Sequence, residues 1–89
     1  MIERELDVTN RLGLHARASA RLVQVLSGYR CNATLSAKGR EVNAKSIMGV
    51  MLLAAGMGTP VLLRVDGDDE AEAADAVAGL FERLFDEDG

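Results

Sequence analysis

The stretch LGLHAR, residues 12–17, joins a glycine-containing loop to the start of a helical pattern. The pattern continues with one buried face spaced i, i+3, i+4 and i+7: Ser19, Leu22, Val23 and Leu26. Gly28 then supplies a stop signal, because glycine readily adopts the backbone conformation that ends a helix. The sequence therefore predicts a helix over residues 16–27, with His15 at or near its N-cap.

Alternating segments on either side of this helix predict strands. The dipeptide Lys38-Gly39 separates two of them and marks a hairpin turn. In chain order, the predicted elements are a strand over residues 2–8, the helix over 16–27, strands over 31–37 and 40–43, a short helix over 46–53, a strand over 61–66, and a last helix from Asp68 or Asp69. The order β-α-β-β-α-β-α predicts an α+β fold, an open-faced β-sandwich in which helices cover one face of a four-stranded antiparallel sheet.

The last helix has its own start signal and apolar face. Asp69 and Glu72 fit a capping box at its N-terminus. Its predicted apolar face consists of Val77, Leu80, Phe81, Leu84 and Phe85.

Length and composition limit the class of protein. The 89 residues suit a single domain over 1–89, and 48% hydrophobic residues suffice for one compact core. A net charge of -4 and only three aromatic residues argue against a nucleic-acid partner. The single Cys31 excludes an internal disulfide and agrees with a cytoplasmic location.

Targeting and metal signals are weak in this sequence. Residues 1–5 are too charged for a secretory signal. The longest apolar run, residues 47–57, is too short to span a bilayer, so we expect no membrane insertion. One histidine and one cysteine do not make a set of metal ligands, and we expect neither a metal nor a cofactor.

The predicted N-terminus of the first helix suits an anion. Its first N–H groups have no partner within the helix and carry about half a positive charge, so such an end binds phosphate readily. His15, the only histidine, would lie there, and the guanidinium of Arg17 would add a full charge and paired donors. Because a neutral imidazole is a nucleophile, the arrangement indicates a phosphoryl acceptor. The alternative is a histidine that only caps the helix.

A second segment, NAKSIMGVM at residues 43–51, opens the short helix. Ser46 fits an N-cap, a role worth about 0.5–2 kcal/mol relative to alanine. The helix is apolar nearly all round, and its core side is expected to hold Val50, Leu53 and Ala54. An exposed patch near His15 would then remain: Ile47, Met48 and Met51. The alternative for these three residues is ordinary core.

The two segments together resemble the HPr family, the histidine-containing phosphocarriers of the bacterial phosphoenolpyruvate-dependent phosphotransferase system. The similarity covers nearly the whole chain in length and element order. Its motifs are GLHAR at residues 13–17 and NAKSIMGVM at residues 43–51, roughly thirty residues apart as in the family.

The resemblance implies a carrier with a covalent phosphohistidine intermediate rather than a stand-alone enzyme. His15 would accept phosphate on Nδ1 from phosphorylated enzyme I and pass it to IIA-type proteins. The N–H groups of Ala16 and Arg17, with the Arg17 side chain, would stabilise the phosphoryl charge. Partners would dock on the solvent-facing side of the first helix and on the exposed patch: Arg21, Gln24, Ile47, Met48 and Met51. We expect a monomer.

Ser46 has a further role in the resemblance. In the family the corresponding serine is phosphorylated by a dedicated kinase, HPr kinase/phosphorylase, and a phosphate would sit favourably at a helix N-terminus. Lys45 is a candidate to help bind that phosphate or the kinase. A purely regulatory HPr-like protein, acting only through Ser46, is one alternative function. A ligand-binding regulatory domain of similar size, such as an amino-acid sensor, is another.

One residue departs from the family pattern. Many HPr proteins have proline where this chain has Ala18. Proline has no N–H and fixes φ, so Ala18 is expected to give a looser cap or one that holds phosphate oxygens differently. The pair Ala18-Ser19 resembles a proteobacterial branch that includes nitrogen-related phosphocarriers. The acceptor could therefore be a sugar transporter or a regulatory IIA protein.

Overall fold

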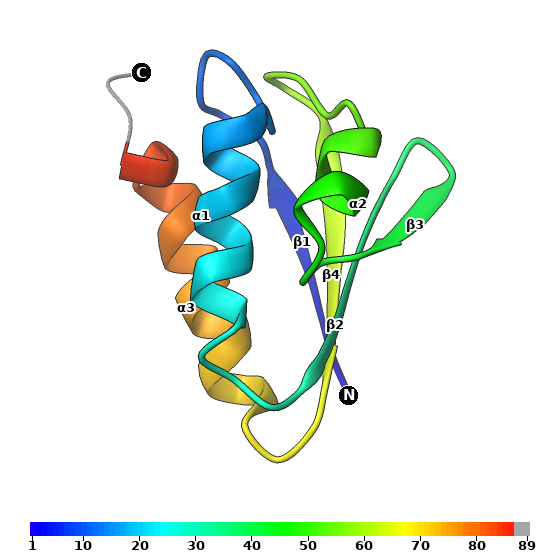
Figure 1. Ribbon diagram of the computed structural model, residues 1–89, viewed down its shortest axis with the longest axis vertical. Helices are drawn as coiled ribbons and strands as arrows, with labels where there is room; N and C mark the ends of the chain where they lie inside the picture. The colour runs from blue at the N-terminus through cyan, green and yellow to red at the C-terminus, as the bar shows by residue number, and fades with distance from the viewer. Residues whose placement is uncertain (87–89) are drawn as a thin grey trace.

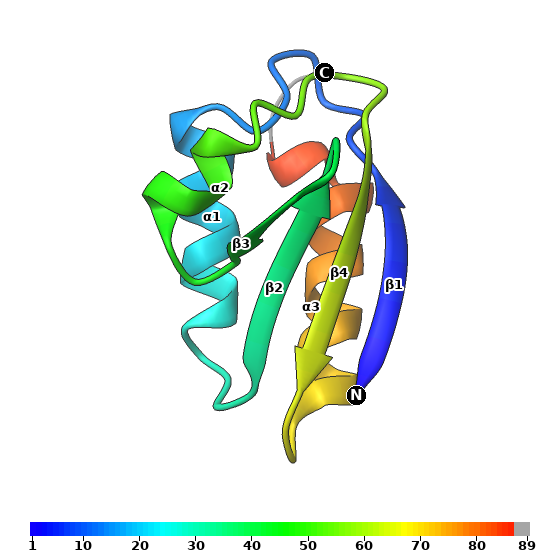
Figure 2. The ribbon, with the colours of Figure 1, turned by 90° about the vertical axis from the view of Figure 1, so that its right-hand side faces the viewer.

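The computed structural model describes residues 1–86 and shows the predicted open-faced sandwich. Helices cover one face of a four-stranded antiparallel sheet, and its other face is open (Figures 1 and 2). The elements are β1 Ile2–Asp7, α1 Ala16–Leu26, β2 Asn32–Ala37, β3 Arg40–Asn43, α2 Ile47–Leu52, β4 Pro60–Asp66, α3 Glu70–Glu82 and a final 3₁₀ turn, η1, Leu84–Asp86. The predicted fold class is confirmed, and apart from the C-terminal end of α3 the element boundaries differ from the prediction by at most two residues.

The sheet has the strand order β1-β4-β2-β3, so the first strand pairs with the last one. Alternation along β2 and β4 sends every second side chain into the core, and the antiparallel register brings Leu35 opposite Leu63. The helices complete this aliphatic core with fully or almost fully buried side chains: Leu22, Leu26, Val77 and Leu80. The core thus fixes α1 and α3 against one face of the sheet.

The turn between β2 and β3 is built as the sequence predicts. Both central residues have positive φ, 53° at Lys38 and 78° at Gly39. This combination matches a type I′ turn, whose twist suits a two-residue hairpin. The tight turn pairs β3 with β2, and the strand order places β3 at one edge of the sheet.

The predicted capping box at the start of α3 is wrong. Asp69 occupies the N-cap position, but its side chain makes no cap hydrogen bond. Its carboxylate instead accepts the backbone N–H groups of Arg30 at 2.7 Å and Cys31 at 3.0 Å. These donors hold the pKa of Asp69 below its ordinary value. Asp69 therefore ties the start of β2 to the start of α3.

The C-terminal end of α3 also differs from the prediction. The helix ends at Glu82, and η1 follows with positive φ at Leu84, Phe85 and Asp86. Leu84 and Phe85 consequently do not continue the apolar face of α3. Phe85 is nevertheless buried, with its ring centroid 4.7 Å from that of Phe81.

Candidate functional site

His15 is the N-cap of α1, as the sequence predicts. Its backbone is extended, with φ -75° and ψ -174°, and its carbonyl accepts the N–H of Ser19 at 2.9 Å. Its imidazole is half-buried, and Nδ1 accepts the N–H of Ala18 at 3.1 Å. The ring therefore sits over the first turn of the helix, where the backbone N–H groups concentrate positive charge. Ala16 and Arg17 form the exposed start of that turn.

The loop before His15 is fixed by the chain segment that follows α2. The N–H of Leu14 donates to the carbonyl of Ala55 at 2.9 Å. At Gly13, φ is +66°, and a Cβ atom would lie only 2.5 Å from the same Ala55 oxygen. The side chain of Asn10 donates to the Gly13 carbonyl at 2.8 Å. Glycine is thus required at residue 13 both by backbone conformation and by the close approach of the two loops.

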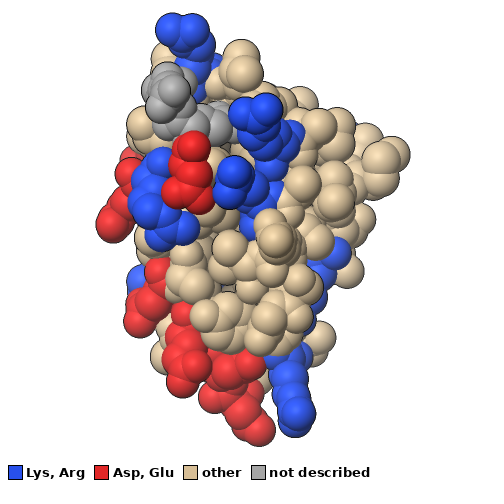
Figure 3. Space-filling view, turned by 60° about the vertical axis from the view of Figure 1, so that its left-hand side comes forward, with Lys and Arg blue, Asp and Glu red and all other residues tan. Residues whose placement is uncertain are grey.

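Positive side chains surround the start of α1. Most Lys and Arg side chains in Figure 3 lie toward the end of the molecule at which α1 begins, and most Asp and Glu side chains lie toward the other end or the edge. Arg17 is exposed and makes no ion pair or hydrogen bond within residues 1–86. Arg21 forms an exposed ion pair with Asp86 at 3.4 Å, and Gln24 is exposed one turn further along. The guanidinium of Arg17 is thus available to an anion.

Ser46 is the N-cap of α2, again as predicted. Its Oγ accepts the N–H of Gly49 at 3.1 Å, and the residue is half-buried. The ammonium group of Lys45 donates to the carbonyl of Tyr29 at 2.7 Å, so this cation is engaged with the end of the α1–β2 loop. Lys45 consequently bridges two segments and does not point freely at Ser46.

The apolar surface patch on α2 is present and larger than predicted. Exposed fractions are 42% for Ile47, 70% for Met48 and 39% for Met51. Sequence reasoning missed Leu52, which is 60% exposed, and it placed Ala54 in the core although that residue is exposed. We define the α2 patch as Ile47, Met48, Met51 and Leu52. In Figures 1 and 2, α2 lies beside the N-terminal half of α1, so the α2 patch and His15 share one end of the molecule.

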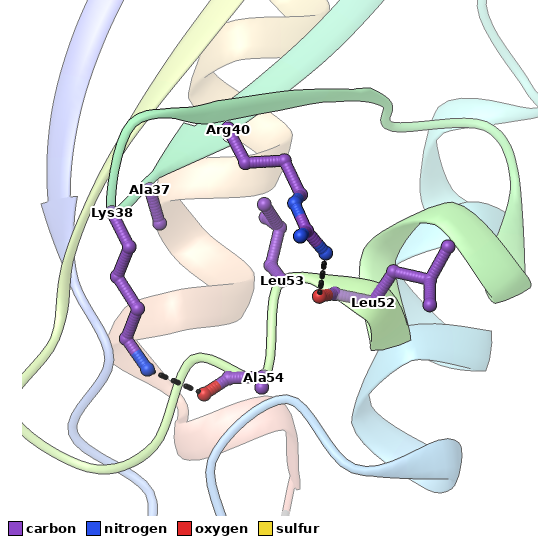
Figure 4. Close-up of a pocket in the computed structure, with 6 residues that line it drawn as sticks. All are labelled: Ala37, Lys38, Arg40, Leu52, Leu53 and Ala54. Carbon is purple, nitrogen blue, oxygen red and sulfur yellow. Dashed lines mark hydrogen bonds between the residues drawn. The ribbon is translucent and has the colours of Figure 1, made fainter.

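Two cations from the β2–β3 hairpin hold the C-terminal end of α2. Lys38 Nζ donates to the carbonyl of Ala54 at 2.9 Å, and Arg40 Nη1 donates to the carbonyl of Leu52 at 3.1 Å (Figure 4). Carbonyls at a helix C-terminus have no partners within the helix and attract positive charge. Side chains of the β2–β3 hairpin thus stabilise the C-terminal end of α2.

The comparison with protein families decides the identity. The model of the family described as PTS HPr component phosphorylation site matches residues 2–83. The chain belongs to the HPr family. Phosphocarrier protein HPr of Xylella fastidiosa (strain Temecula1) is 64% identical over 88 residues, which cover 99% of both chains. The crystal structure of HPr from Thermoanaerobacter tengcongensis matches all of both chains with a TM-score of 0.96 at 40% identity.

HPr-like regulatory proteins share this fold. Crh, the catabolite repression protein of Bacillus subtilis, is 38% identical, with a TM-score of 0.75 over 94% of this chain and 97% of its own. That relative was crystallised as a domain-swapped dimer. A solved relative with this fold therefore exchanges a segment between two copies.

Within residues 1–86, no three His, Cys, Asp or Glu side chains are grouped closely enough to hold a metal ion. In that same part of the chain, every helix is too short or too polar to cross a membrane.

Proposed function

We propose that this HPr phosphocarrier receives a phosphoryl group on His15 from phosphorylated enzyme I and passes it to IIA-type acceptor proteins. The observation that carries the proposal is the position of the only imidazole, directly over the first turn of α1. A phosphoryl group on Nδ1 would lie beside unpaired backbone N–H groups at the positive end of a helix. The protein would act as a monomer in the cytoplasm.

The proposed transfer depends on charge and position. The transferred phosphoryl group carries negative charge on three oxygens, and a carrier needs little chemistry beyond stabilising and orienting it. The N–H groups of Ala16 and Arg17 are the first two of α1 and belong to the turn beside which the phosphoryl group would lie. The exposed guanidinium of Arg17 adds paired donors that suit phosphate.

The proposed docking surface combines the α2 patch with the solvent-facing side of α1. Methionine side chains adapt their shape, which suits a surface that must bind several proteins in turn. Arg21 and Gln24 lie exposed on α1 and would supply polar contacts to a docked partner. Enzyme I and the IIA-type acceptors would therefore use overlapping surfaces around His15.

Regulation at Ser46 is the second part of the proposal. Ser46 is the N-cap of α2 and directly precedes the α2 patch, so a phosphate placed there by HPr kinase/phosphorylase would lie at the edge of the docking surface. A carrier without this regulation and a protein regulated only through Ser46 are the two limiting alternatives.

Intact-mass analysis distinguishes a phosphocarrier from a protein regulated only through Ser46 and from a ligand-binding domain. The protein is incubated with phosphoenolpyruvate and enzyme I, and its mass is measured before and after mild acid treatment. We expect one acid-labile phosphate on the wild type and on Ser46→Ala, and none on His15→Ala. Acid-labile phosphate on His15→Ala would contradict the proposal. Acid-stable phosphate only, formed with kinase and ATP on Ser46, would identify a regulator. No phosphate under either condition would favour a ligand-binding domain.

A further inference from the structure

A hydrogen bond joins the imidazole of His15 to the backbone N–H of Ala18, at 3.1 Å from nitrogen to Nδ1. An imidazole nitrogen accepts such a bond only with its lone pair, so Nδ1 carries no proton in this arrangement and the neutral ring holds its proton on Nε2. The same lone pair is needed to form a bond from Nδ1 to phosphorus. The Ala18 N–H and an incoming phosphoryl group therefore compete for one pair of electrons.

The donor in this contact depends on the residue type at position 18. Ala18 is the third residue of α1 and is fully buried. Its N–H belongs to the first turn, where backbone donors have no acceptor within the helix. Proline in this place would have no N–H at all. The presence of alanine thus determines whether His15 has this partner.

We propose that the N–H of Ala18 is a positioning group that exchanges partners during phosphoryl transfer, from Nδ1 in the free protein to a phosphoryl oxygen in the phosphorylated one. The inference rests on the function proposed above and deepens it. The Ala18 N–H holds the ring in place before transfer and stabilises the phosphoryl group afterwards.

The transfer step balances without an external base. The lone pair of Nδ1 forms a bond to phosphorus of the phosphorylated donor protein, while the bond from phosphorus to the donor breaks and its electron pair stays on the donor. The proton on Nε2 remains, so the ring becomes positively charged and the phosphoryl group carries two negative charges. The N–H of Ala18, released from Nδ1, then donates to a phosphoryl oxygen.

The exchange favours the phosphorylated form. A hydrogen bond to a charged oxygen is stronger than one to a neutral nitrogen. The hydrogen bond that the Ala18 N–H donates therefore becomes stronger when the phosphoryl group is transferred to His15. The effect of one such bond is about two- to tenfold in an equilibrium constant. A chain with proline at residue 18 would lack this gain and hold its phosphoryl group less strongly.

A competition experiment tests this preference. Equal amounts of wild type and Ala18→Pro protein are mixed with a limiting amount of phosphoenolpyruvate and a catalytic amount of enzyme I. Intact mass then gives the phosphorylated fraction of each. We expect the phosphoryl group to accumulate on the wild type by about two- to tenfold. Ala18→Gly, which retains the N–H, is the matched control and should divide the phosphoryl group evenly with the wild type. Even division with Ala18→Pro, or accumulation on that variant, would overturn the proposal.

An NMR measurement on the wild type does not depend on whether the proline variant folds. The chain has one histidine, so the Nδ1 signal of ¹⁵N-labelled protein is assigned without ambiguity. We expect a scalar coupling between the Ala18 amide nitrogen and Nδ1 in the free protein, replaced after phosphorylation by coupling to ³¹P. Absence of the first coupling, or its persistence in the phosphorylated protein, would overturn the proposal. If the wild type takes up no phosphate on His15, both the proposed function and this inference are overturned. If His15 is phosphorylated but the phosphoryl group divides evenly between the wild type and Ala18→Pro, only the inference is overturned.

Discussion

At the scale of single residues, Arg17 has a proposed functional role and few structural contacts. It is exposed and has no ion pair or hydrogen bond within residues 1–86. Its side chain therefore contributes little to folding, whereas its charge lies at the site of the expected phosphoryl group. Substitution of Arg17 should therefore reduce phosphoryl transfer without reducing the stability of the fold.

Arg17→Ala is expected to slow phosphoryl transfer from enzyme I while leaving the protein folded. Removal of one stabilising donor typically reduces rates by ~10²–10³ in enclosed sites, and solvent exposure of Arg17 makes this an upper limit. The free energy of unfolding should change by less than about 0.5 kcal/mol. Quench-flow transfer rates and urea unfolding measure the two effects. Arg30→Ala, at an exposed arginine in the loop between α1 and β2, is the control. A wild-type transfer rate in Arg17→Ala would reject the assigned role.

Gly13→Ala is expected to destabilise the protein more than an ordinary glycine substitution. Residue 13 has φ +66°, and its added Cβ would lie 2.5 Å from the Ala55 oxygen. Gly39→Ala is a matched control, because φ is +78° there and no atom lies within 4 Å of the added Cβ. The left-handed conformation should cost both variants about 1–2 kcal/mol. Urea unfolding measures the loss of unfolding free energy in each variant. A larger loss in Gly13→Ala than in Gly39→Ala reports the contact between the two loops, whereas equal losses would show that the loops separate easily.

The sequence predicts the positions of the two N-cap residues from local signals. His15 and Ser46 were placed correctly at two N-caps, because their side-chain acceptors match unpaired N–H groups close by in the chain. The Ala18 donor was not assigned to His15, since every non-proline residue has a backbone N–H and sequence does not show its partner. The role of Asp69 was wrong because Arg30 and Cys31, its actual donors, lie almost forty residues away in sequence.

At the scale of elements, α2 shows where periodicity stops being informative. The helix is six residues long, less than two full turns, so a periodic pattern has little length in which to emerge. Its C-terminal end is set by Lys38 and Arg40 from a different element. The chain then turns at Ala54, with φ +50°, which carries this side chain to the surface. Because these contacts come from a distant part of the chain, the sequence pattern wrongly predicted Ala54 in the core and did not predict the exposure of Leu52.

Phosphorylation of Ser46 is expected to inhibit phosphorylation of His15 by weakening the docking of enzyme I. A phosphate adds about -1.5 to -2 charges beside the α2 patch, and desolvating it against an apolar or acidic partner surface is unfavourable. The same charge interacts favourably with the N-terminus of α2, so the free protein should remain folded. Ser46→Asp should reproduce part of the effect.

Enzyme I affinity and melting temperature distinguish this mechanism from unfolding. Both are measured for the wild type, the Ser46-phosphorylated protein and Ser46→Asp, with Ser46→Ala as the uncharged control. We expect weaker binding with an unchanged or higher melting temperature in the charged forms. Unchanged affinity, or weaker binding that accompanies a lower melting temperature, would argue against the docking mechanism.

At the scale of the whole molecule, the sequence predicted the layers but not the order of the strands. Alternation with period two and helical spacing identified all seven main elements, since each has one face that must be buried. Local patterns do not state which strands pair over long distances. The pairing of β1 with β4 joins residues 2–7 to residues 60–65, and it emerges only when the whole core closes.

Asp69 should make the stability of the whole fold depend on acid pH. Hydrogen bonds, chiefly from the Arg30 N–H, lower the pKa of Asp69 below its ordinary value of 3.8. Because the folded pKa lies below the unfolded one, the stabilisation is fully present above pH 3.8 and is lost as the pH falls through the lowered folded pKa. Asp69→Asn should therefore be less stable than the wild type near neutral pH and approach it in acid.

Urea unfolding over a series of pH values tests this dependence. The measured quantity is the difference in unfolding free energy between the wild type and Asp69→Asn. Asp68→Asn, at the exposed neighbouring carboxylate, is the control and should show a smaller and flatter difference. A difference for Asp69→Asn that stays constant down to the lowest pH at which the protein folds would contradict the assignment.

The pairing of the first strand with the last has a consequence for synthesis on the ribosome. The β2–β3 hairpin is local and can form as soon as residues 32–43 have emerged. β1 is made first, yet its only partner in the sheet is β4, so it must wait until residues 60–66 leave the ribosome. Long-range strand pairing is slow because the intervening loop must close first. The β2–β3 hairpin should thus be able to form before β1 joins the sheet, although β1 is synthesised first.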